Sequence, residues 1–221
     1  MEFIPIDKET WPRREYFDHY FSAVPCFYSM TTALDITRLR QEKVRLYPAL
    51  LYLLTQTVNR HIPFRTAIRN GQLGYFDRME PSYTVFSKET ETFSSIWTLC
   101  QGDYATFLAD YERDVAAYAA SGKFSPKPNP PENLFNVSMI PWARFEGFHL
   151  DLPRGGEYLL PIFTLGQFYE KEGRWFIPLA SQVHHAVCDG FHLCRFLDDL
   201  QAQCQRAAGP VPVSGGDALF A

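Results

Sequence analysis

Segments with helical periodicity and segments with strand character follow one another along this chain without strict alternation. Between residues 46 and 58, apolar side chains recur three and four positions apart, which predicts an amphipathic helix; they are Leu46, Ala49, Leu50, Leu53, Leu54 and Val58. The next segment contains Asn70-Gly71, a pair typical of a tight hairpin turn with two positive φ angles. This mixed order predicts an α/β (α+β) two-layer sandwich, in which helices cover a mixed, largely antiparallel β-sheet.

The remaining elements follow from the same patterns. Tyr83 to Phe86 predicts a strand, and Asp103 is a plausible N-cap for a helix with one apolar face made of Phe107, Leu108, Tyr111, Val115 and Tyr118. Residues 125–133 contain four prolines, so we expect an ordered loop. We expect strands over 134–142 and 160–186 and in the region between them, with a turn near Gly173.

The end of the chain predicts one more helix and a tail. The helix starts after Asp189 and aligns one face, made of Leu193, Cys194, Leu197, Leu200 and Cys204. Beyond residue 207 the chain is rich in Pro, Gly and Ser. We therefore expect a single domain over residues 1–207 and a loose tail over 208–221.

Composition excludes several classes of protein. The formal net charge is −4 and no more than two Lys or Arg residues are adjacent, which argues against a nucleic-acid partner. The N-terminus lacks the pattern of a secretory signal, and no apolar run approaches the roughly 20 residues that span a bilayer. The five cysteines form no Cys-x-x-Cys pair. Free thiols in the reducing cytoplasm are therefore expected, with no association with a membrane.

Residues 182–192, "QVHHAVCDGFH", contain three of the six histidines of the chain. Side chains of a strand alternate between faces, so His184 and His185 are expected on opposite sides, and only one of them faces a given cleft. Asp189 stands where an N-cap acid belongs at the start of a helix. Taken singly, such residues are most often structural.

Two chemical alternatives remain open from these residues. His185, Asp189 and His192 offer metal ligands at short spacing, but the chain has no His-Glu-x-x-His motif, and we expect no metal. Cys188 lies near His185, but nothing in the sequence marks its thiol as exposed or activated. We interpret Cys188 as a small buried apolar residue.

The eleven-residue segment resembles the active-site signature of the trimeric type-A chloramphenicol acetyltransferases. Its shorter core, His-x-x-x-Asp-Gly, recurs in other coenzyme A-linked acyltransferases, including dihydrolipoamide acyltransferases. The resemblance extends from about Glu2 to about Cys204, through "WPRREYFDHY", "LDITRL", "YPALLYLLTQTVN", "TVFSKETETFS", "PENLFNVSMIPW" and "FEGFHL". It implies a two-layer sandwich whose homotrimer has active sites at the subunit interfaces.

The resemblance also implies a reaction and the residues that perform it. Acetyl-coenzyme A would be the co-substrate, and a primary hydroxyl of chloramphenicol would accept the acetyl group, which gives antibiotic resistance. His185 would be the general base and Ser138 would stabilise the oxyanion. Thr164 would hold a water, and Asp189 would pair with Arg13 to fix the geometry around His185.

The same resemblance implies the residues that bind the two substrates. The acceptor pocket would be formed by Tyr20, Val24, Cys26, Tyr28, Leu150 and Ile162, and the pantetheine channel by Trp142 and Phe168. The sequence departs from the family pattern at Ser125, where an aromatic is usual, although Phe124 is adjacent. Tyr28 and Val24 also stand where Phe and Leu are common. These departures concern the acceptor and not the chemistry.

Three other functions stay open at this point. The first is acyl transfer to another hydroxylated acceptor, and the second is a lipoamide-type catalytic domain, which the absence of a lipoyl segment disfavours. The third is a drug-binding trimer without activity, which the presence of His185, Asp189, Ser138 and Arg13 argues against.

Overall fold

The computed structural model describes residues 1–152 and 157–206. The expected tail over 208–221 lies outside these residues. Within them, a seven-stranded mixed sheet runs in the order β2 (Phe27–Asp35), β10 (Arg174–His184), β8 (Ile162–Leu165), β7 (Leu134–Met139), β5 (Glu80–Ser87) and β6 (Thr92–Trp97), with β9 (Tyr169–Lys171) paired to β10. A three-stranded sheet has the order β1 (Phe3–Pro5), β4 (Gln72–Phe76) and β3 (Thr66–Arg69).

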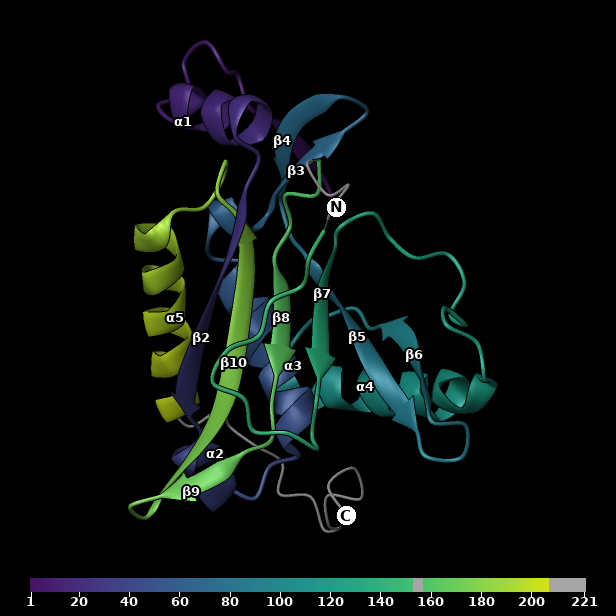
Figure 1. Cartoon of the computed structure of the whole chain (residues 1–221). Helices are drawn as coiled ribbons and strands as arrows, with labels where there is room; N and C mark the ends of the chain where they lie inside the picture. The colour runs from purple at the N-terminus through teal and green to yellow at the C-terminus, as the bar shows by residue number, and fades with distance from the viewer. Residues whose placement is uncertain (153–156, 207–221) are drawn as a thin grey trace.

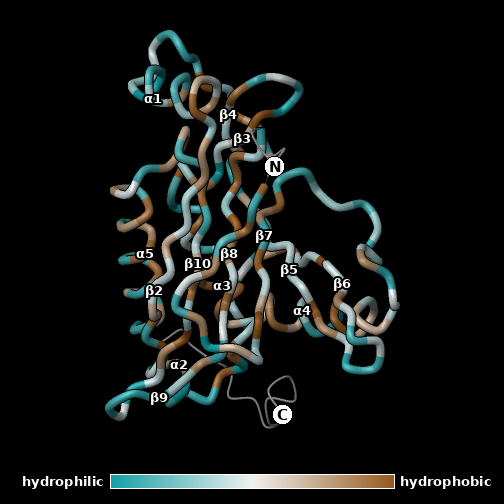
Figure 2. The backbone as a smooth tube through the Cα atoms, viewed as in Figure 1, coloured by the Kyte–Doolittle hydropathy of each residue, from teal (hydrophilic) through white to brown (hydrophobic). Residues whose placement is uncertain are grey.

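Helices pack on one face of the large sheet, while a loop crosses the other (Figure 1). The longer helices are α3 (Leu46–Val58), α4 (Tyr104–Tyr118) and α5 (Gly190–Gln205). The shorter elements are α1 (Arg14–Asp18), the π-helical turn η1 (His19–Ala23), α2 (Thr37–Gln41) and the 3₁₀ turns η2 (Ile62–Phe64) and η3 (Ala119–Ser121). Figure 2 shows apolar residues along the central strands and α3 and polar residues in the outer loops. No helix in the described part of the chain is long and apolar enough to span a bilayer.

The predicted fold class is confirmed. Four of the pairings in the large sheet are antiparallel, and the β5–β7 and β7–β8 pairings are parallel. Asn70 and Gly71 have φ values of 52° and 77°, as the hairpin between β3 and β4 requires. Asp103 caps α4 by accepting a hydrogen bond from the backbone N–H of Thr106.

Two expectations about local structure were wrong. The described residues between β7 and β8 form an irregular loop and not strands. Because β7 and β8 are parallel, the chain must return along the sheet between them, and here an extended loop makes that return. Cys194 is exposed, because it lies one position past Leu193, and the buried face of α5 continues instead through Phe196 and Leu200.

The proline-rich loop over 125–133 is held by a buried ion pair. Lys127 Nζ lies 2.7 Å from Asp114 Oδ2 of α4, and these side chains are only 13 % and 6 % exposed. Lys127 also donates to the carbonyl oxygen of Trp97, and its ammonium lies 3.8 Å from the centre of that indole ring. These contacts explain why a segment without regular structure is ordered.

Replacing Lys127 with Met should lower the free energy of unfolding by about 3 kcal/mol, because Asp114 then stays buried as an unpaired charge. Urea-induced unfolding measures this loss. Adding Asp114→Asn should restore part of the stability by removing that charge. A free energy of unfolding that does not change in the single variant would contradict this role for the pair.

Candidate active site

His185 directly follows β10 and lies between two tyrosines. Its backbone N–H donates to the carbonyl oxygen of Cys26 at 3.0 Å, which extends the β10–β2 pairing by one residue. Its ring stacks on Tyr20 with centroids 3.9 Å apart and meets the edge of Tyr28 at 5.3 Å. Nδ1 of His185 is buried and has no hydrogen-bond partner among the described residues. Because a buried nitrogen cannot meet a substrate, Nε2 is the nitrogen able to exchange a proton with one.

His184 lies on the other side of the sheet, as strand alternation predicted. It is fully buried, it packs against the edge of Phe27 at 4.5 Å, and its Nδ1 accepts a hydrogen bond from the N–H of Ala186. Phe27 and Tyr28 are consecutive on β2, so their side chains lie on opposite faces of the sheet. Phe27 contacts His184 and Tyr28 contacts His185, so the two histidine rings also lie on opposite faces. His184 therefore has a structural place, and His185 is the histidine beside the tyrosines.

Asp189 joins the start of α5 to the N-terminal segment. One of its oxygens accepts a hydrogen bond from Arg13 at 2.7 Å. The other caps α5 and lies 2.7 Å from Nδ1 of His192. A carboxylate can only accept, so Nδ1 of His192 is the donor, and both oxygens of Asp189 are engaged within the chain. This arrangement leaves Asp189 poorly placed as a metal ligand, and no cluster of three or more candidate ligands occurs in the described residues.

Cys188 does not have the features of a nucleophile. Its side chain is 1 % exposed, and burial raises the pKa of the thiol to about 12. A thiol that stays protonated near neutral pH cannot attack a carbonyl efficiently. The interpretation of Cys188 as a buried apolar residue is confirmed.

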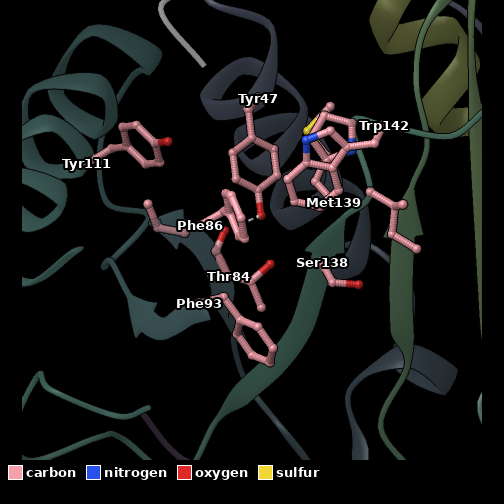
Figure 3. A pocket seen from close by; sticks show the side chains of 11 residues that line it. Tyr47, Thr84, Phe86, Phe93, Tyr111, Ser138, Met139 and Trp142 are labelled. Carbon is pink, nitrogen blue, oxygen red and sulfur yellow. Dashed lines mark hydrogen bonds between the residues drawn. The ribbon is translucent and has the colours of Figure 1, made fainter. Parts of the chain in front are cut away.

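A second group of polar side chains lies where β7 and β8 run side by side. Ser138 and Thr164 are partners in this parallel register, and their hydroxyl oxygens are 2.9 Å apart. Ser138 also lines a mostly apolar cavity of about 250 Å³ that extends to Trp142. Figure 3 shows Ser138 and Trp142 on the side of the cavity away from Tyr111.

Several residues that line this cavity carry no local signal in the sequence. Thr84, Phe86 and Phe93 belong to β5 and β6 and line the same cavity, where the ring of Phe86 meets that of Trp142 edge-on at 4.6 Å (Figure 3). Their segment "TVFSKETETFS" was recognised as similar to the family, but alternating apolar and polar residues there equally suit an ordinary strand. Only the pairing of β5 with β7 places them at the site.

The other predicted acceptor residues do not form one cluster. Tyr20, Cys26 and Tyr28 adjoin His185, whereas Ile162 lies on β8 and pairs in register with Gln182. Leu150 lies in the loop between β7 and β8, and Val24 is 51 % exposed at the end of η1.

Phe168 and Phe124 lie outside the set of residues that line the cavity. Phe168 packs on Trp175, and its neighbour Gln167 bonds to Ala143, the residue after Trp142. Phe124, beside Ser125, is exposed and meets the edge of Phe93.

One chain does not bring His185 and Ser138 to the same reacting atom. Thr164 lies opposite Ala180 on β10, and His185 is five residues further along, or about 16 Å at roughly 3.3 Å per residue. A base and an oxyanion donor must each lie about 3 Å from the reacting group. We call the residues around His185 the histidine half-site, and Ser138, Thr164 and the adjoining cavity the serine half-site.

The signature, the fold and these two half-sites together identify a family. The family model described as chloramphenicol acetyltransferase matches residues 1–201. The chain belongs to the chloramphenicol acetyltransferase family. Membership makes it an acyltransferase, and the resemblance stated from the sequence is confirmed.

Individual relatives agree with this assignment. A chloramphenicol acetyltransferase of Campylobacter coli is 59% identical over 202 residues, which cover 91% of this chain and 98% of the relative. One of Clostridium perfringens is 56% identical over 202 residues, with the same two coverages. Among solved structures, a chloramphenicol acetyltransferase superposes with a TM-score of 0.78 at 22% identity and covers 91% of this chain and 99% of its own. A probable dihydrolipoamide acetyltransferase of Listeria monocytogenes has the same fold, with a TM-score of 0.64 at 10% identity, covering 93% of this chain and 95% of its own.

Replacing Asp189 with Asn should lower stability at neutral pH but have little effect in acid. Burial opposes the charge of Asp189, yet the hydrogen bond from Arg13 and the nearby His192 outweigh it and hold the pKa of this carboxyl below its ordinary value. The ion pair therefore stabilises the folded chain above about pH 4, and this contribution is lost as the pH falls through the lowered pKa. Thermal unfolding at several pH values should show the gap between the two proteins closing as the pH falls through the lowered pKa of Asp189.

Asp189→Asn should also reduce kcat, because loss of the Arg13–Asp189 ion pair would displace His185. A variant with normal kcat, or a stability gap that is constant from neutral to acid pH, would show that the pair does not hold the site.

Proposed function

We propose that the protein transfers the acetyl group of acetyl-coenzyme A to a primary hydroxyl of chloramphenicol and thereby gives resistance to that antibiotic. The observation that best supports this is His185, whose Nδ1 is buried and whose ring is held between Tyr20 and Tyr28 in the family signature. The names of the relatives from Campylobacter coli and Clostridium perfringens support the same acceptor. Neither a metal nor a nucleophilic cysteine has a part in this proposal.

The chemistry requires one base and one oxyanion donor. Nε2 of His185 takes the proton of the acceptor hydroxyl while the oxygen attacks the thioester carbonyl carbon. The carbonyl becomes an oxyanion, which accepts a hydrogen bond from the hydroxyl of Ser138. When the intermediate collapses, the carbon–sulfur bond breaks, and the coenzyme A thiolate takes the proton from the imidazolium. Acetylated drug and free coenzyme A leave, and no acyl-enzyme forms.

The Ser138–Thr164 pair supports an oxyanion role. Thr164 is 2 % exposed, and its hydroxyl accepts from or donates to Ser138, which fixes the position of both oxygens. A hydroxyl held in this way loses little freedom when charge develops on the substrate. Trp142, at the cavity edge, supplies a flat apolar surface for the pantetheine arm. Phe168 follows Gln167, whose backbone N–H donates to the carbonyl oxygen of Ala143, the residue after Trp142.

We infer that the complete active site needs two copies of the chain. About 16 Å along β10 separates the backbone positions of the two half-sites, whereas the mechanism requires them to act on one carbon. The sheet face that contains Asn136, Ser138 and Ser29 is polar and only partly buried, so it is available to a second copy. A closed ring with threefold symmetry, as the resemblance implies, would pair each histidine half-site with the serine half-site of a neighbour.

Two further parts of the proposal concern the acceptor alcohol and the cellular compartment. Tyr28 and Val24 stand where the family often has Phe and Leu, so a different hydroxylated acceptor is the second candidate. The cytoplasm is proposed as the compartment because all five cysteines are unpaired among the described residues and suit a reducing environment.

Thiol release from acetyl-coenzyme A should depend on chloramphenicol and on His185. His185→Ala should lower kcat by about 10²- to 10⁴-fold, the usual contribution of a general base. Ser138→Ala should lower kcat by about 10²-fold or more, as expected for one oxyanion donor.

A matched control comes from a histidine far from the site. His61 bonds to Asp199 of α5 and packs on Phe196, not on a residue of either half-site, so His61→Gln should keep normal kinetics. Drug-dependent release that persists in His185→Ala would contradict the assignment of the base. Release with a different alcohol but none with chloramphenicol would favour the second candidate.

A further inference from the structure

Gln182 opens the signature segment, and neither the mechanism nor the substrate contacts use it. Gln182 is 4 % exposed and lies on β10, the neighbour of the edge strand β2. In register, Gln182 lies between Ser29 of β2 and Ile162 of β8. A buried amide must satisfy its donors and its acceptor within the protein, so its partners indicate its role.

The partner of Gln182 is the peptide of Leu150. Its Oε1 accepts from the N–H of Leu150 at 2.8 Å, and its Nε2 donates to the carbonyl oxygen of Leu150 at 2.9 Å. The side-chain amide thus bonds both the N–H and the C=O of Leu150, as the backbone of a neighbouring strand would. Ser29 reinforces the arrangement, because its hydroxyl bonds to Oε1 of Gln182 at 3.2 Å and to Nδ1 of His149 at 2.8 Å.

The segment held in this way is the loop that crosses the open face of the sheet, residues 140–152, here called the strap (Figure 1). Backbone bonds hold its start: Ile140 donates to Leu165, and Ala143 accepts from Gln167, each at 2.8 Å. Phe145 packs so closely on Gly166 that an added Cβ would lie 2.8 Å from its ring. At the far end, the described hydrogen bonds to the backbone of the strap come from Gln182.

We propose that Gln182 is a positioning residue that sets the acceptor pocket, by holding Leu150 at a fixed place on the open face of the sheet. Gln182 lies on β10, which pairs with β8 at Thr164 and ends one residue before His185, so it fixes the strap end to the strand that positions both half-sites. Without the amide, Leu150 would lose both of its backbone partners and the strap end would move. This inference rests on the proposed function for its effect on the drug, because Leu150 is there assigned to the acceptor pocket.

The test compares Gln182→Met with a matched control. Met has the same length and no amide, so it removes both bonds with little change of shape. Gln201 of α5 makes the same pair of bonds to the peptide of Asp35, at 2.9 and 3.0 Å, at the opposite end of β2. Gln201→Met therefore removes an equal set of hydrogen bonds outside the site.

In Gln182→Met, the KM for chloramphenicol should rise about fivefold to tenfold, on the scale of a lost hydrogen bond. The kcat and the KM for acetyl-coenzyme A should stay within about twofold of wild type. Gln201→Met should lower the melting temperature and leave all three constants unchanged. An unchanged KM for chloramphenicol in Gln182→Met, or equal changes in the two variants, would overturn the proposal.

Amide hydrogen exchange gives a second readout that does not need activity. The N–H of Leu150 should exchange at least about tenfold faster in Gln182→Met than in wild type, and at the wild-type rate in Gln201→Met. If wild type releases no thiol with chloramphenicol, the proposed function fails, and exchange at Leu150 alone then decides whether Gln182 holds the strap. Protection that survives in Gln182→Met would refute that role.

Discussion

The pairing of β10 between β2 and β8 fixes the strand to which both half-sites are attached. On one side, the β2 register places Tyr28 beside the strand end and lets Cys26 accept from the N–H of His185. On the other side, the β8 register places Thr164 opposite Ala180 and Ile162 opposite Gln182. A shift of one residue in either pairing would turn these side chains to the opposite face, so the fold and the site depend on the same hydrogen bonds.

The two faces of the large sheet have different tasks. The face that packs on the helices is filled by apolar residues such as Phe163, Leu165 and Leu179, all fully buried. The other face carries Ser29, Ser138 and Thr164 and is crossed by the strap. Polar side chains on a sheet face are costly to bury unless they have partners. Their presence here is consistent with a face that holds substrates and a second chain rather than a core.

Much of the fold followed from local sequence signals. The Asn70-Gly71 turn, the Asp103 cap and the helix after Asp189 each depend on a few neighbouring residues whose backbone preferences are strong. The strap did not follow, because its aromatic residues resemble those of a strand, and only the parallel pairing of β7 with β8 makes it a return loop. The exposure of Cys194 was missed for a smaller reason, since one position on a helix is a rotation of about 100°.

The site was predictable only in part. The signature indicated His185 and Asp189, and strand alternation separated His185 from His184. Ser138 has no local signal, because a serine in a strand is ordinary until a partner such as Thr164 is placed beside it. Thr84, Phe86 and Phe93 come from another part of the chain, and Gln182 shows its role only through Leu150, 32 residues away. Contacts between residues so far apart in the chain cannot be predicted from any single segment of the sequence.

The central claim is that His185 of one chain works with Ser138 of another. Co-expressing His185→Ala with Ser138→Ala tests it most directly, because each variant alone should be nearly inactive. With random mixing in a closed ring, roughly a quarter of the sites would pair an intact His185 with an intact Ser138, and the mixture should regain about that fraction of wild-type thiol release. A mixture as inactive as either variant alone, in a sample shown to contain hybrid oligomers, would place both residues in one chain and contradict the account.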